Sequence, residues 1–107
     1  MSTTITISDE IARSLDRLPG NGSVSTEDKL RSLLLSEYHR RLARYRLTDT
    51  RLSQKYAMDF NTFEKMGLTI EPGHTWEVDQ DSIAWETAID GIATMERQIT
   101  ALQSSRE

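Results

Sequence analysis

The chain has 107 residues and no cysteine, which limits it to one domain, or one small domain with an arm, and excludes disulfides and thiolate metal sites. Hydrophobic residues make up 36% and charged residues 28%, so we expect a second copy or a partner to complete the core. The net charge of −4 is unevenly divided: residues 1–56 hold ten Lys or Arg against seven Asp or Glu (+3), whereas residues 57–107 hold three against ten (−7). The first half therefore suits an anionic partner and the second half a basic one.

The first predicted element is a short strand at residues 3–8, TTITIS. Its alternation places Ile5 and Ile7 on one face and hydroxyl side chains on the other, as a half-buried strand requires. A single strand in a mostly helical chain has no evident partner, and unpaired backbone N–H and C=O groups are costly. Antiparallel pairing of the strands of two chains would satisfy these groups, so the sequence predicts a dimer.

Two helices are predicted after the strand. Ser8 is a natural N-cap for the first, and residues 19–23, PGNGS, end it. Ser25 caps the second, with an acid three residues later as in a capping box. The apolar face of this second helix continues to about residue 47.

The next part of the chain is predicted to consist of short elements. A break or bend is expected at residues 48–50, TDT, followed by a short helix to about residue 56 and another from Asp59 that ends at Gly67. Residues 68–78, LTIEPGHTWEV, are expected to be extended, either as a small hairpin or as an irregular strap.

The last predicted element is a helix capped by Asp79. Its apolar residues are spaced 3-4-3-4-3, the pattern of a heptad seam. Such a seam could bind a groove on a protein partner, fold back on the N-terminal head at residues 1–47 or pair with its twin, and the residues leave these uses open. The seam comprises Trp85, Ala88, Ile92, Met95, Ile99 and Leu102.

Residues 3–46 resemble a ribbon-helix-helix domain of the Arc/MetJ/CopG type. The matching segments are T-I-T-I-S, the helix D-E-I-A-R-S-L-D-R-L and the turn G-S-V-S-T. The whole chain resembles the small antitoxins of type II toxin–antitoxin pairs, in which such a head precedes a toxin-binding tail. The resemblance implies a mainly α fold with a ribbon-helix-helix head at 1–47, made of one short strand and two helices, and an acidic helical arm at 48–107.

The resemblance also implies a homodimer that binds operator DNA. The ribbon would read bases, and the start of the second helix would hold a phosphate. This ribbon has no Arg or Lys, and acids follow the phosphate site, so DNA binding by the chain alone is predicted to be weak. The implied DNA-binding residues are Ser2, Thr4, Thr6, Ser25 and Thr26, and the implied dimer core is Ile5, Ile7, Leu15, Leu30, Leu33 and Leu34.

The acidic arm is the predicted toxin-binding region. On a basic toxin, such as an RNase that must itself attract RNA, the acids would steer encounter and large apolar side chains would form the buried centre. Aromatic residues of a small domain equally often form its core, and this alternative stays open. The predicted toxin-binding residues are Phe60, Phe63, Trp76, Trp85, Ile89, Ile92, Met95 and Ile99.

Nothing in the sequence indicates an enzyme. The two histidines, His39 and His74, have no acid at ligand spacing, so no catalytic residue, metal site, cofactor or small-molecule substrate is predicted. The basic cluster at residues 39–46, HRRLARYR, is expected to be a solvated face that pairs with acids of the arm, with RNA or phosphate binding as a lesser alternative.

The predicted function is that of an antitoxin that neutralises a protein toxin through its arm and represses its own operon through its head. Without a signal-peptide pattern or an apolar run of membrane-spanning length, the protein is expected to be cytoplasmic with no membrane partner. The alternatives are a stand-alone dimeric ribbon-helix-helix regulator and an interaction protein that binds no DNA.

Overall fold

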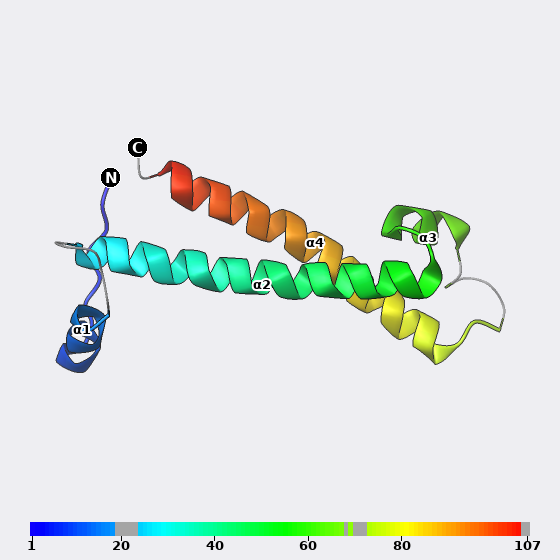
Figure 1. Ribbon diagram of the computed structural model, residues 1–107, viewed down its shortest axis with the longest axis horizontal. Coiled ribbons are helices and arrows are strands. Elements are labelled where there is room, and N and C mark those ends of the chain that lie inside the picture. Colours follow the sequence, from blue (N-terminus) through cyan, green and yellow to red (C-terminus); the bar gives the residue numbers. More distant parts are fainter. Residues whose placement is uncertain (19–23, 68, 70–72, 106–107) are drawn as a thin grey trace. The chain divides into compact units, whose positions relative to one another are not determined.

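The structure, a computed structural model, describes residues 1–18, 24–67, 69 and 73–105. Its helices are α1 (Asp9–Asp16), α2 (Thr26–Tyr56), α3 (Phe60–Met66) and α4 (Trp76–Ser104) (Figure 1). The chain divides into two compact units, residues 1–36 and 37–107, so α2 begins in the first unit and ends in the second. This division lies inside the predicted 1–47 head.

The predicted strand at residues 3–8 is absent, and the described residues contain no strand at all. Ile5 and Ile7 are 69% and 41% exposed, so the alternation does not mark a buried face. Two alternating isoleucines favour a strand only where another extended segment hydrogen-bonds beside them, and no such segment is described in this chain. The ribbon-helix-helix prediction is therefore wrong, whereas the mainly α class is confirmed.

The first unit contains α1 and the start of α2, and its helix caps are those that were predicted. The Ser8 hydroxyl accepts a hydrogen bond from the backbone N–H of Ile11 at 3.2 Å. At the start of α2, the Ser25 hydroxyl accepts a hydrogen bond from the backbone N–H of Asp28 at 3.0 Å. Lys29 Nζ donates to the backbone carbonyl of Asp16, which ties α2 to the end of α1. The predicted turn at 19–23 lies outside the described residues.

The predicted break at residues 48–50 does not occur, because α2 stays helical as far as Tyr56. The helix ends instead at Ala57, whose φ of 56° is in the left-handed region. The backbone N–H of Met58 donates to the carbonyl of Ser53 at 3.1 Å, the six-to-one hydrogen bond of a Schellman motif. Glycine is the usual residue at the position that Ala57 occupies.

The prediction for α3 is confirmed. Asp59 caps the helix by accepting from the N–H of Thr62 at 2.8 Å, and Gly67 ends it with a φ of 64°. The N-cap of α4 was predicted wrongly: Thr75 accepts from the N–H of Val78, and α4 begins at Trp76, within the stretch expected to be extended. Part of that stretch, residues 68 and 70–72, lies outside the described residues.

Within the second unit, α4 runs antiparallel to the last part of α2 (Figure 1). Of the three uses left open for the heptad seam, the structure has the seam packed on α2 of the same chain. Trp85, Ala88, Met95 and Ile99 are buried, and Ile92 and Leu102 are half-buried. The hairpin formed by residues 37–56 of α2 and by α4 is therefore a packed structure with its own core.

Candidate partner-binding surface

One end of the hairpin is filled by an aromatic core. Trp85 and Phe63 are 0% and 2% exposed, and their ring centroids are 5.0 Å apart. Tyr56 lies 4.9 Å from Phe63 and 5.9 Å from Trp85, and Phe60 lies 5.5 Å from Trp85. These rings join α2, α3 and α4, so their main contacts are with one another.

The indole of Trp85 has a polar partner inside this core. Its Nε1 donates to Asp49 Oδ1 at 2.8 Å, which satisfies a donor that burial would otherwise leave without water. Sequence reasoning missed Asp49 and assigned it to a helix break. The signal was present: Leu42, Tyr45, Asp49, Leu52 and Tyr56 are spaced 3-4-3-4, so Asp49 occupies a core position of an otherwise apolar and aromatic seam.

Lys55 links the end of α2 to the first turns of α4. Its Nζ lies 2.5 Å from Glu77 and 2.7 Å from Asp81, and the Tyr56 hydroxyl also donates to Asp81 at 2.7 Å. Burial alone would raise the pKa of Asp81, but the hydrogen bonds from Lys55 and Tyr56 outweigh it and hold that pKa below its usual value. Burial, followed by the Asp81 hydrogen bond, raises the pKa of Tyr56 to about 12.

A second cross-helix ion pair supports part of the expectation for the basic cluster at 39–46. Arg46 binds Glu96 of α4 at 3.0 Å, as expected for a basic face that pairs with acids of the arm. Arg40 and Arg41 instead bind Glu37 on their own helix, and these hydrogen bonds lower the pKa of Glu37 to about 2. Two cations of the basic half, Arg46 and Lys55, are thus paired with acids of the acidic half.

The predicted toxin-binding residues do not form one exposed set. Trp76, the first residue of α4, is 73% exposed. Phe60, Ile89 and Ile92 are half-buried. The buried members, which the chain itself covers, are Phe63 on α3 and Trp85, Met95 and Ile99 on α4.

A different row on α4 faces solvent, and we name it the acidic stripe: Trp76, Asp79, Ile83, Glu86 and Asp90. The spacing is 3-4-3-4, so the five side chains share one helix face. Ile83 is 66% exposed, and only Asp79 is half-buried, its carboxylate lying 2.9 Å from His74 Nε2. In the described part of the chain, Glu86 and Asp90 form no ion pair.

The outer face of α2 carries the opposite charge. We name Arg40, Arg44 and Arg51 the arginine row; with Leu47 they are spaced 4-3-4. All four are exposed, Leu47 to 70%. This face points away from the seam that contacts α4, because Leu47 is two residues, or about 200°, from Tyr45 of that seam. The hairpin therefore has a basic face on one helix and an acidic face on the other.

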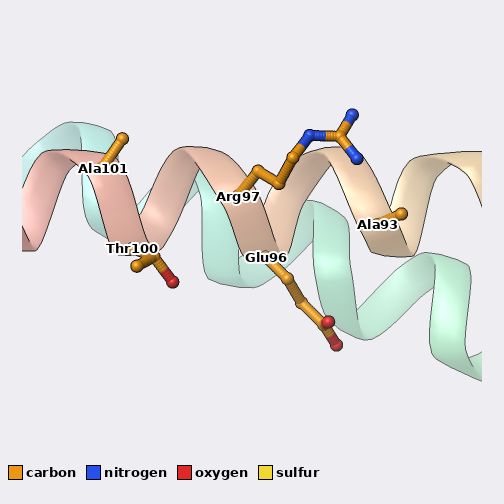
Figure 2. Close-up of a pocket in the computed structure, with 5 residues that line it drawn as sticks. All are labelled: Ala93, Glu96, Arg97, Thr100 and Ala101. Atoms are coloured by element: carbon orange, nitrogen blue, oxygen red, sulfur yellow. The ribbon is translucent and has the colours of Figure 1, made fainter.

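A hollow of about 520 Å³ lies along the second half of α4. Figure 2 shows that Arg97 and Glu96 point to opposite sides of the helix. The hollow is open and does not enclose a ligand, because it lies on the surface of one helix and three of its lining side chains are small. The lining residues are Ala93, Glu96, Arg97, Thr100 and Ala101.

The first unit leaves most of its apolar side chains in solvent. Of the predicted dimer core, Leu15 is buried and Leu30 half-buried. The exposed large apolar residues of this unit are Met1, Ile5, Ile7, Ile11, Leu18, Leu33 and Leu34. The predicted DNA-binding residues Ser2, Thr4, Thr6, Ser25 and Thr26 are all exposed, and Ser25 caps α2.

Neither a metal site nor a membrane span emerges from the residues that the structure describes. Across them, no group of three or more His, Cys, Asp or Glu side chains could hold a metal ion. No helix among them combines the length and apolar character needed to cross a bilayer. No family model matches the chain, and neither a curated protein nor a solved structure is significantly similar to it.

Proposed function

We propose that this chain is an antitoxin that neutralises a basic protein toxin in the cytoplasm by binding it through the acidic stripe of α4. The observation that carries the proposal is the exposure of Trp76 and Ile83 on one helix face that also bears Asp79, Glu86 and Asp90. Large apolar side chains on a helix face otherwise rich in acids are costly to hydrate and are the type of anchor found at interface centres.

The chemistry of the stripe defines the partner. Trp76 and Ile83 require an apolar pocket, and the flanking carboxylates require Lys or Arg around that pocket. The carboxylates would speed encounter and disfavour acidic proteins, whereas the two apolar side chains would supply most of the affinity. An RNase toxin, which must attract RNA with basic residues, meets these requirements.

The exposed apolar residues of the first unit support self-association as part of this proposal. A unit of 36 residues is too small to bury a sufficient core alone, and among its described residues only Leu15 is a buried hydrophobic. We assign this face to a second copy of the chain, through helix faces that carry Leu33 and Leu34. Operator binding was predicted from the ribbon, which is absent, and it forms no part of the proposal.

The proposal is tested by co-expressing the chain with the product of the neighbouring gene and scoring growth and complex formation. Trp76→Ala and Ile83→Ala should each release toxicity, and Trp76→Ala should weaken the complex by about 2 kcal/mol, or roughly 30-fold. Leu47→Ala is the matched control, because Leu47 is as exposed as Ile83 but lies on the outer face of α2.

Both stripe variants should fold normally, since substitutions of exposed residues change stability by only about 0.5 kcal/mol. Equal protection by wild type, Trp76→Ala and Ile83→Ala would place the inhibitory surface elsewhere. A neighbour that is not toxic would refute the antitoxin class and leave an interaction protein without a toxin. Trp85→Ala is uninformative here, because loss of a 0%-exposed tryptophan would disrupt the hairpin itself.

A further inference from the structure

The second half of α2 concentrates positive charge that α4 does not fully neutralise. Residues 37–56 contain six Lys or Arg against two acids. Asp49 accepts from Trp85, and Glu37 is shared by Arg40 and Arg41. The six basic residues are Arg40, Arg41, Arg44, Arg46, Arg51 and Lys55.

Two of these six cations bind α4, and two others, Arg40 and Arg41, bind Glu37 on α2 itself. Arg46 and Lys55 pair with Glu96, Glu77 and Asp81. Within the described residues, Arg44 and Arg51 form no ion pair, although the charge of Arg51 helps to lower the pKa of Asp81. The exposed side chains of Arg44 and Arg51 thus retain hydrogen-bond donors for a ligand.

The Arg40 end of the row is partly organised. Arg40 donates from Nε and Nη2 to the two oxygens of Glu37 at 2.8 and 2.6 Å, and Arg41 Nε donates to the same carboxylate at 2.9 Å. This carboxylate holds two guanidinium groups side by side while leaving other N–H donors of each free for a ligand. Arg40, Arg41, Arg44 and Tyr45 line a hollow of about 200 Å³, enough space for a phosphate group and water.

The arginine row has the length of a short stretch of nucleic-acid backbone. From Arg40 to Arg51 the helix rises about 16 Å at 1.5 Å per residue, and one strand of a duplex advances about 3.4 Å per phosphate. A row of this length spans about five phosphates, so it fits a linear polyanion better than one small ion. Leu47 is the single exposed apolar side chain among the four spaced residues of this face, which gives an acidic protein little to bury.

We propose that the arginine row on the outer face of α2 binds the phosphate backbone of nucleic acid without reading its sequence. Arginine forks match phosphate oxygens, and the ring that lines the hollow, that of the half-buried Tyr45, packs against Gly91 of α4, which leaves it poorly placed to stack on bases. The site is separate from the acidic stripe and does not depend on the toxin. One hairpin would thereby hold a basic protein on α4 and nucleic acid on α2.

The test measures fluorescence anisotropy of a labelled 20-nucleotide single-stranded RNA with the full-length chain at several salt concentrations. If three arginines each contact a phosphate, a plot of the logarithm of the association constant against the logarithm of the salt concentration should have a slope of about −2. Each phosphate contact on a single strand contributes about −0.7 to this slope. Arg44→Gln and Arg51→Gln should each weaken binding several-fold and reduce the magnitude of the slope by about 0.7.

Arg97→Gln is the control, because it removes the same charge from α4 and should leave RNA binding unchanged. Circular dichroism checks that each variant retains its helices. Absence of salt-dependent binding, or equal weakening by Arg97→Gln, would overturn the proposal. Displacement of RNA by millimolar inorganic phosphate would show that the site binds a single phosphate, which contradicts the proposal. Equal binding of labelled poly-glutamate would assign the row to acidic proteins and would contradict it as well.

Discussion

Substitution of Gly91 by alanine tests the packing of α4 on α2, because the sign of its effect on the free energy of unfolding depends on whether the Tyr45 ring lies against residue 91. A Cβ at Gly91 would lie 2.5 Å from Cδ2 and Cε2 and 2.6 Å from Cζ of Tyr45, about 1 Å closer than ordinary van der Waals contact. Helix propensity alone favours alanine over glycine by about 1 kcal/mol, and overpacking costs about 1–3 kcal/mol. We expect Gly91→Ala to destabilise the protein by about 1 kcal/mol.

The double variant separates these two terms. With Tyr45→Ala the ring is gone, so Gly91→Ala should then stabilise the protein by up to about 1 kcal/mol. Urea unfolding followed by circular dichroism at 222 nm gives the free energy of unfolding of wild type, both single variants and the double variant. If Gly91→Ala stabilises the protein while Tyr45 is intact, the ring does not lie against α4 as described and the argument fails.

Three further predictions concern the hairpin and its ends. Asp49→Ala should lower the free energy of unfolding by about 1–3 kcal/mol because the Trp85 indole N–H loses its acceptor, whereas Asp49→Asn, which keeps an oxygen acceptor, should cost less in urea unfolding. Ala57→Gly should raise the melting temperature, since glycine avoids a left-handed cost of about 1 kcal/mol; an unchanged or lower value would contradict the φ of 56°. Tyr56 should ionise near pH 12 in absorbance titrations. Because its pKa in the folded protein is raised above the unfolded value of about 10, its contribution to stability is complete below pH 10 and is lost as the pH rises toward 12. Tyr56→Phe should remove this loss of stability at high pH.

Features set by neighbouring residues were predictable from the sequence. Ser8 and Ser25 were identified as N-caps, and Gly67 as a helix end, because a cap depends on one side chain and the next three residues. The long final helix and its seam were also predicted, since a 3-4 spacing of apolar residues sustained over several turns is typical of an amphipathic helix.

Features that depend on distant contacts were not predictable. The strand was inferred from Ile5 and Ile7, but the existence of a strand depends on what lies beside it. The break at residues 48–50 was inferred from two threonines and an aspartate, which are weak helix formers; packing of Leu52 and the Asp49–Trp85 hydrogen bond override that preference.

The candidate site was recovered only in part. Trp76 was identified, but composition could not distinguish it from Trp85, because both lie in the acidic half and only the complementary seam on α2 shows which one is covered. Ile83 was missed, although the 3-4-3-4 spacing that relates it to Trp76 and Asp90 was present in the sequence. Because α4 carries two such rows, one with Trp85 and one with Trp76 and Ile83, the packing of α4 on α2 decides which row faces inward.

The Asp49–Trp85 hydrogen bond also distinguishes between alternative registers of the two helices in the hairpin. Two apolar seams with the same 3-4 repeat can slide past each other by one repeat and still bury similar area. A slipped register would leave the indole N–H and the carboxylate facing apolar groups, and it would separate Lys55 from Asp81 and Arg46 from Glu96. A single part-buried polar pair therefore selects one alignment of the two helices along their axes.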